Sequence, residues 1–175
     1  MLEGLVVRRA GAADADTIAR LHLASYRFAY RGLLPAEFLT GLEVGERERR
    51  WRASLADPGR VTYIAADGAG RLAGFAEAGG CRDDDMDGAV TGELMALHVG
   101  ERWQHQGIGR LLHARAAALL ASRGFTTAML WVLTDNAPAR GFYAALGWTA
   151  DGRTRHQVLR GADVREVRYA IRLPS

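Results

Sequence analysis

The stretch Leu94-Met95-Ala96-Leu97-His98-Val99, followed after Gly100–Trp103 by Gln104-His105-Gln106-Gly107-Ile108-Gly109, decides the fold of this 175-residue chain. The first run is apolar on nearly both faces, which is typical of a strand in the middle of a sheet and covered on both sides. The second run opens a helix predicted over residues 107–123, which carries an apolar stripe and ends at Gly124. A central strand that leads directly into a helix predicts a sheet with that helix packed on it.

The loop between this strand and this helix has the features of an anion site. Gly107 and Gly109 remove side chains where the backbone must approach a ligand closely. The first turn of a helix leaves backbone N–H groups unpartnered, the helix dipole adds positive charge, and Arg110 adds a full charge. The alternative is a plain turn, because Gly-x-Gly alone is weak evidence. Leu112 stands where a dinucleotide fingerprint has its third glycine, and no Gly-Lys-Ser/Thr follows, so neither that motif nor a Walker loop is present.

The rest of the chain surrounds this unit with strands, helices and hairpin turns. Strands are expected at residues 5–9, 60–66, 71–79, 90–99, 126–133, 148–158 and 163–172. Helices are expected at residues 12–28, 35–43, 46–56, 107–123 and 137–146. The pattern predicts one domain over residues 1–175, of the α+β class, with a mixed, mostly antiparallel central sheet flanked by helices.

The composition is that of an ordinary globular protein, with 49% hydrophobic and 25% charged residues. No apolar stretch approaches the roughly 20 residues needed to span a membrane, and the N-terminus lacks a signal-peptide pattern. The lone Cys81 fits a reducing compartment, so we expect a cytoplasmic protein without membrane contact. The net charge is +3, and the densest basic run, residues 46–52, is interleaved with acids. We therefore expect no nucleic-acid partner, although a mild positive bias suits a polyanionic cofactor.

These motifs resemble a known family. Gln-x-x-Gly-x-Gly after an apolar strand resembles the acetyl-CoA motif of the GNAT superfamily of N-acetyltransferases. Residues 130–148 resemble the family's segment of strand, Asn, Phe-Tyr and Leu-Gly-aromatic, and residues 21–51 resemble a common GNAT opening. The resemblance covers residues 5–172 and departs at Gly100, where the family often has Pro. It implies a GNAT-like fold and transfer of an acetyl group from acetyl-CoA to a primary amine, by direct attack in a ternary complex. The alternative is a non-catalytic acyl-CoA-binding sensor or regulatory module on the same fold.

The resemblance also implies which residues bind acetyl-CoA. The loop of Gln104, His105, Gln106, Gly107, Ile108, Gly109 and Arg110 would hold the pyrophosphate. The backbone of Leu97, His98 and Val99 would bond the pantetheine amides like an added strand, in a slot opened where this strand splays from the next. The backbone N–H near Leu97 would then serve the oxyanion. Asn136 would contact the pantetheine arm or the substrate, and Arg140 is assigned to the cofactor with it.

Tyr143 is the candidate acid. Asn136, Arg140 and Tyr143 are spaced so that they share one helix face. A separate apolar face is expected to point to the core, formed by Ala139, Phe142 and Leu146. The resemblance implies that Tyr143 protonates the CoA sulfur. The alternative is a core tyrosine.

Glu93 is the candidate base. It heads the central apolar strand, where burial would raise the pKa of a carboxyl group toward a useful range. The alternatives are a strand-end carboxylate on the surface for Glu93, and a packed or surface residue for His98, which could also act as a base. The presence of both Glu93 and Tyr143 favours the enzyme over the sensor.

The acceptor pocket is the least readable part. Tyr26, Tyr30 and Arg31 are candidates on one side, and Arg155 and His156 on the other. The acceptor could be a small molecule or a protein amine, and a homodimer is possible. We interpret the run 83–87 as a solvated turn, although it could attract a cationic substrate. The histidines show no metal-ligand spacing, so we expect no metal.

Overall fold

The computed structural model describes residues 4–159 and 161–174. The strands are β1 (Val6–Arg9), β2 (Arg60–Ala66), β3 (Leu72–Gly80), β4 (Thr91–Val99), β5 (Thr127–Leu133), β6 (Thr149–Leu159) and β7 (Ala162–Arg172). The helices are α1 (Ala15–Ala29), α2 (Ala36–Thr40), α3 (Val44–Ala56), α4 (Ile108–Ser122) and α5 (Ala137–Ala144), with 3-10 turns at Ala12–Asp14 and Glu101–Trp103. Each predicted element is present. The predicted helix 12–28 is divided between a 3-10 turn and α1, and the predicted helix 35–43 is the shorter α2.

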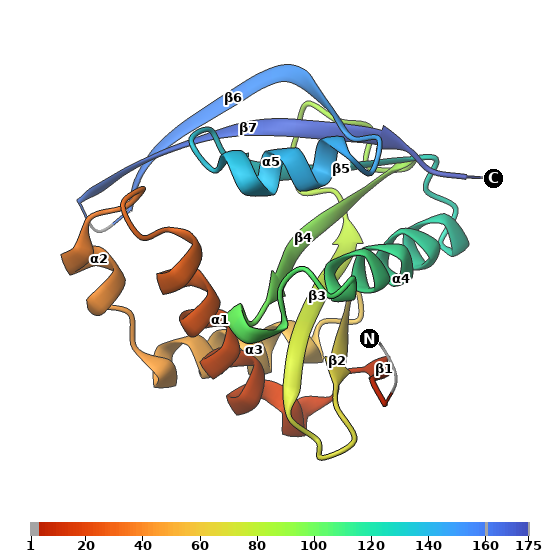
Figure 1. The fold of residues 1–175 in the computed structure, drawn as a ribbon. Coiled ribbons are helices and arrows are strands. Elements are labelled where there is room, and N and C mark those ends of the chain that lie inside the picture. The colour runs from red at the N-terminus through yellow and green to blue at the C-terminus, as the bar shows by residue number, and fades with distance from the viewer. Residues whose placement is uncertain (1–3, 160, 175) are drawn as a thin grey trace.

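The strands form one sheet in the order β1-β2-β3-β4-β5-β7-β6 (Figure 1). Neighbours are antiparallel except β4 and β5, which run parallel and are joined by α4. A parallel pair needs such a crossover, whereas antiparallel pairs can be joined by short turns. The predicted α+β class, with a mixed and mostly antiparallel sheet, is confirmed.

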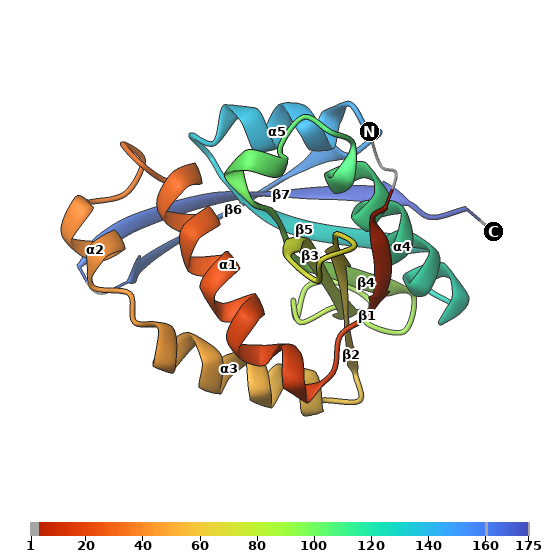
Figure 2. The same cartoon turned by 60° about the horizontal axis from the view of Figure 1, so that its bottom comes forward.

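Helices cover both faces of the sheet (Figure 2). On one face, α1 and α3 bury Ile18 and Trp51 against Phe75 of β3. On the other face, α4 buries its apolar stripe, including Leu112, against Ala76 and other small residues of β3. Small side chains on the sheet let a helix approach closely, so the alternation along β3 assigns a bulky face to α1 and a flat one to α4. The predicted left-handed glycines after α4 and α5 are confirmed, with φ of 89° at both.

The predicted core-facing stripe of α5 packs against the core, but the helix also buries a residue outside that stripe. Tyr143 is the buried residue of this helix, whereas Phe142 and Leu146 of the expected core-facing stripe are partly buried. The physical reason is that α5 packs on two neighbours at once. Phe142 lies against α4, where a Cβ on Gly109 would come within 3.3 Å of its ring, while the Tyr143 ring packs edge-on against Trp148 at 6.0 Å.

Gly74 of β3 is expected to be essential for packing next to the end of β4. A Cβ on Gly74 would lie 2.8 Å from the carbonyl oxygen of His98 and 3.0 Å from Leu112 Cδ1. The carbonyl belongs to the sheet backbone and cannot move aside, so we expect Gly74→Ala to lower the free energy of unfolding by about 1–3 kcal/mol. Urea denaturation measures this change.

Gly88→Ala is the matched control. Its Cβ would meet nothing within 4 Å, and its φ is not positive. We expect a change within about 0.5 kcal/mol, as for an ordinary surface substitution. Equal destabilisation by both variants would contradict the packing argument.

Candidate functional site

The central feature of the site is the separation of β4 from β5. The two strands pair only where Thr91–Glu93 lies beside Thr127–Met129. In the next part of β4, the pairing with β3 shifts by one residue between Leu94 and Ala96, so that Met95 is an extra, bulged residue. A bulge bends a strand and increases its twist. From Leu94 onward the edge of β4 that faces β5 therefore has no strand partner, and its side chains beyond Leu94 are half-buried rather than buried.

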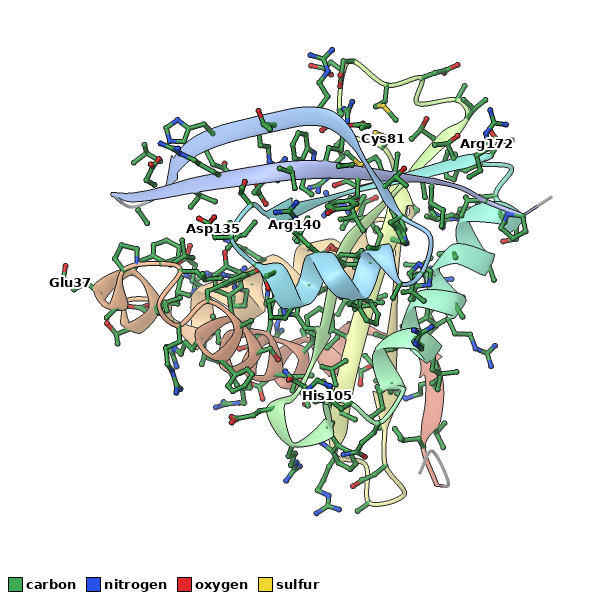
Figure 3. The ribbon with its side chains drawn as sticks, turned by 45° about the horizontal axis from the view of Figure 1, so that its top comes forward. Glu37, Cys81, His105, Asp135, Arg140 and Arg172 are labelled. Carbon is green, nitrogen blue, oxygen red and sulfur yellow. The ribbon has the colours of Figure 1, made fainter. Side chains whose placement is uncertain are left out.

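The opened strand leads to the predicted anion loop. Gly107 caps α4 with φ of 86°, and His105 also has a positive φ, of 59°. No backbone N–H from His105 to Arg110 donates to an acceptor within residues 4–159 and 161–174. The first turn of a helix with unpartnered N–H groups and a positive dipole end binds anions such as phosphate. Figure 3 labels His105 in this loop.

Two glycines of this region act for different reasons than the sequence suggested. Gly109 was predicted to allow close approach of a ligand, but its missing Cβ also leaves room for the ring of Phe142 in α5. Gly100, where the family often has Pro, has a proline-like φ of −59°. Its N–H nevertheless donates to the carbonyl of Ala73 at 2.9 Å, a bond that proline cannot make. This hydrogen bond fastens the start of the loop to β3.

Tyr143 of α5 lies on the side of the sheet that α4 covers. Its hydroxyl makes no hydrogen bond within the described part of the chain, and burial raises the pKa of the phenol. Burial and, to a smaller extent, the electrostatic interaction with Tyr143 raise the pKa of Tyr30, the residue that follows α1. The two tyrosines are therefore near one another, although they come from opposite sides of the sheet. The phenol is therefore a protonated donor with a free hydroxyl.

Asn136 and Arg140 have local partners that sequence reasoning missed. The side-chain oxygen of Asn136 accepts a hydrogen bond from the N–H of Ala139 at 3.2 Å and so caps α5. Arg140, labelled in Figure 3, donates to the carbonyl of Thr134 at 2.8 Å and to the hydroxyl of Tyr169 at 3.1 Å. The guanidinium group thus anchors α5 to β5 and β7. An Asn directly before a predicted helix was a signal that could have revealed the cap.

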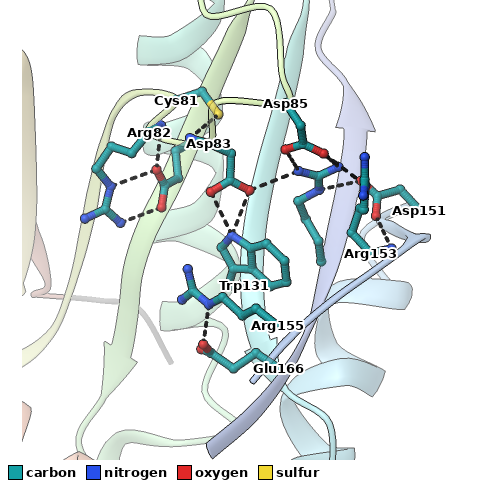
Figure 4. A network of polar contacts seen from close by, with 11 residues as sticks. Cys81, Arg82, Asp83, Asp85, Trp131, Asp151, Arg153, Arg155 and Glu166 are labelled. Atoms are coloured by element: carbon teal, nitrogen blue, oxygen red, sulfur yellow. Dashed lines mark hydrogen bonds and ion pairs between the residues drawn. The ribbon is translucent and has the colours of Figure 1, made fainter. Parts of the chain in front are cut away.

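Glu93 lies on β4 at the point where the strands separate. The alternative of a surface carboxylate is wrong, because Glu93 is 3% exposed. Its carboxylate accepts hydrogen bonds from Arg82 Nε at 2.9 Å and Nη2 at 2.5 Å, and from the Arg82 backbone N–H at 3.2 Å. Both carboxylate oxygens are therefore occupied by one arginine (Figure 4).

In the acidic run 83–87, Asp84, Asp85 and Asp87 are exposed, as predicted for a solvated turn, but two carboxylates of the run are also paired. Asp83 and Asp85 both pair with Arg168 of β7, whose side chain is 5% exposed, and Asp151 adds a third carboxylate at 2.6 Å. Asp83 also accepts from the indole N–H of Trp131 at 3.0 Å (Figure 4). The guanidinium of Arg168 lowers the pKa of Asp85. The β3–β4 loop is consequently fastened across β5 and β7, and Asp83 and Asp85 are already paired with a cation.

The acceptor candidates fall into two groups. Tyr26 and Tyr30 pack edge-to-face at 4.1 Å, and the His98 ring lies 6.3 Å from Tyr26 on the same face of the sheet. Burial raises the pKa of both phenols. Arg31 instead lies exposed in the turn after α1.

On the opposite wall, Arg155 lies over the Trp131 ring at 4.4 Å and pairs with Glu166 at 2.5 Å. Glu166 influences the pKa of both Tyr26 and Tyr30, so this wall is near them. His156 is exposed and pairs with Asp163 instead.

Neither a metal-binding cluster nor a membrane-spanning helix is found in residues 4–159 and 161–174. No group of three or more His, Cys, Asp or Glu side chains in that part of the chain is arranged to hold a metal ion. No helix there has the length and apolar character that crossing a membrane requires.

Known proteins share this arrangement. The sequence matches the acetyltransferase (GNAT) family over residues 25–148. It is 33% identical over 141 residues to an uncharacterized N-acetyltransferase, YuaI, of Bacillus subtilis, a match covering 81% of this chain and 78% of that protein. It is 30% identical to a mycothiol acetyltransferase of a Nocardioides species, covering 90% of this chain but 55% of that longer protein.

Solved structures share the fold. The YncA acetyltransferase of Salmonella typhimurium, solved with acetyl-CoA, superimposes with a TM-score of 0.72 at 19% identity, covering 98% of this chain and 95% of that one. PaiA N-acetyltransferase of Thermoplasma acidophilum, solved with coenzyme A, has the same TM-score at 19% identity, covering 93% and 97%. With the separated strands, the anion loop and the family match together, this chain belongs to the GNAT family of acetyl-CoA-dependent N-acetyltransferases.

Proposed function

We propose that this protein transfers the acetyl group of acetyl-CoA to a primary amine by direct attack within a ternary complex. The observation that carries the proposal is the slot between β4 and β5, which ends at the unpartnered N–H groups of His105–Arg110. A thioester held in such a slot is reachable from both faces of the sheet. The acceptor is a small molecule or a protein amine.

The cofactor would lie on the side of α4 and α5. Its pyrophosphate would accept hydrogen bonds from the N–H groups between Gln104 and Arg110. Its pantetheine amides would bond to the free edge of β4 at Leu97–Val99, as an added strand does. The N–H near Leu97 would serve the oxyanion. Asn136, whose amide nitrogen has no partner among residues 4–159 and 161–174, would contact the pantetheine arm or the substrate.

Two protons must move in this reaction. The attacking amine loses one, and the departing thiolate gains one, because thiols have pKa values near about 8.5. Tyr143 is the proposed donor to the sulfur, since its hydroxyl is free and its raised pKa keeps it protonated. Glu93 is the base that the family resemblance implies, acting through water, but Arg82 binds both of its oxygens, which leaves the acceptor of the amine proton open.

Gly107→Ala should weaken coenzyme A binding. A left-handed φ of 86° costs an alanine about 1 kcal/mol or more. The backbone would relieve this strain by changing its conformation, which would reorient the N–H groups of the loop. We expect the Kd for coenzyme A, measured by calorimetry, to rise about tenfold. Gly124→Ala is the control, because it places the same residue at φ of 89° at the other end of α4 with open space around its Cβ. Loss of stability in both variants with unchanged Kd in both would refute the loop's role.

Tyr143→Phe should lower kcat by about 10²-fold or more while the Kd for coenzyme A stays nearly constant, because only the proton donor is removed. Since burial raises the pKa of Tyr143, the wild-type enzyme should show no alkaline loss of kcat from this group below about pH 10. A thiol-release assay over an amine panel measures both. Tyr63→Phe, on β2 away from the slot, is the control. An unchanged kcat would contradict the acid role, and absence of wild-type turnover on every amine would favour the sensor.

A further inference from the structure

His98 has surroundings that no structural role in the sheet explains. It lies on the unpaired half of β4, and its ring packs in an aromatic box with His22 at 4.6 Å, Phe75 at 5.3 Å and Tyr26 at 6.3 Å. Within residues 4–159 and 161–174, neither nitrogen of the ring has a hydrogen-bond partner, whereas His22 Nδ1 accepts from the Trp51 indole at 3.1 Å. A half-buried imidazole with two free nitrogens is available to a ligand in the slot.

The imidazole ring of His98 carries no charge at pH 7. Burial, aided by the positive charge of Arg47 from α3, lowers the pKa of His98 to about 4. The other titratable groups that face it are His22 and Tyr26 of α1, and burial lowers the pKa of His22 and raises that of Tyr26. Phe75 of β3 is apolar. The ring is therefore a neutral imidazole at pH 7, with a lone pair to offer.

Glu93 is less suited to this step. Its two oxygens bind Arg82, and Glu93 is only 3% exposed. Accepting a proton would therefore break this ion pair. The proton acceptor needs a free lone pair near the amine, and His98 has it.

We propose, on the basis of the function proposed above, that His98 is the catalytic residue that takes the proton from the attacking amine. It lies on the α1 face of β4, whereas Tyr143 lies on the α5 face, so the thioester carbonyl in the slot has a base on one side and an acid on the other. Acceptor amines consequently enter from the side of Tyr26 and Tyr30.

The step balances without a further reactant. The neutral amine nitrogen bonds to the thioester carbon, and His98 takes one N–H proton from the resulting ammonium. The C–S bond then breaks, and the thiolate takes the phenol proton of Tyr143. Solvent carries the proton from the imidazolium of His98 to the phenolate of Tyr143, which restores both groups and leaves an amide and CoA thiol.

The test compares His98→Gln with Glu93→Gln after an active amine has been found for the wild type. We expect His98→Gln to lower kcat by about 10²-fold, with the KM for acetyl-CoA changed by less than about twofold. His113→Gln is the control. His113 belongs to α4, on the other face of the sheet, and its Nε2 accepts a hydrogen bond from the Trp148 indole at 2.8 Å. Glu93→Gln should lower the free energy of unfolding, and it should reduce kcat less than His98→Gln does.

Two readouts distinguish a base from a structural residue. Added imidazole should restore part of the kcat of His98→Ala and none of that of Tyr143→Phe, since only the former lacks a base. Nuclear magnetic resonance of the wild-type imidazole signals should show His98 neutral at pH 6. The proposal is overturned if His98→Gln retains kcat while Glu93→Gln loses it, or if added imidazole restores none of the kcat of His98→Ala. A wild type inactive toward every amine would instead refute the proposed function itself.

Discussion

The separation of β4 from β5 after Glu93 is the constraint on which the rest of this structure depends. Parting two central strands exposes backbone groups that a sheet would otherwise pair, and such groups are costly when buried and unsatisfied. The bulge at Met95 accounts for the direction in which β4 leaves, but a bulge alone does not hold a gap open. A sheet with this opening is stable only if both strands are fixed from outside.

The surrounding contacts supply that support on each side of the gap. On the α5 side, Arg140 bonds the helix to the end of β5 and to Tyr169 of β7. On the opposite face, Arg168 fastens the β3–β4 loop across β5 and β7 through Asp83 and Asp85. The start of β4 is thus held by its pairing with β5 and by the β3–β4 loop, while β5 is also held by α5 and β7.

Sequence reasoning predicted the elements, the class of sheet and the anion loop, because each of these depends on local patterns. Apolar runs, glycines at helix ends and the Gln104–Gly109 loop are legible within a few residues. It could not predict the partners of Glu93 and Asp85, because Arg82 and Arg168 meet them only after the β3–β4 loop has folded back over the sheet. The sequence analysis predicted only a solvated turn for residues 83–87, whereas the fold also pairs Asp83 and Asp85 with Arg168.

The burial of Tyr143 in α5 was not predicted, for a related reason. Helical periodicity identifies an apolar face but assumes a single packing surface. Because α5 packs on α4 and on the sheet together, Phe142 and Tyr143 both face neighbours, and a polar-ended residue becomes the more buried of the two. The free hydroxyl of Tyr143 and the pairing of Glu93 then emerge only from tertiary contacts.

These contacts give the two faces of the slot opposite electrostatic characters. The face of α4 carries a row of free N–H groups at a positive helix end, which suits a polyanion. On the other face, Asp83 and Asp85 are bound by Arg168, Glu93 by Arg82 and Glu166 by Arg155, so the carboxylates present no uncompensated charge to the slot. The side chains closest to His98 are aromatic or neutral. An amine entering there must shed its charge to match its surroundings, and loss of a proton is the chemical event that acetyl transfer requires of it.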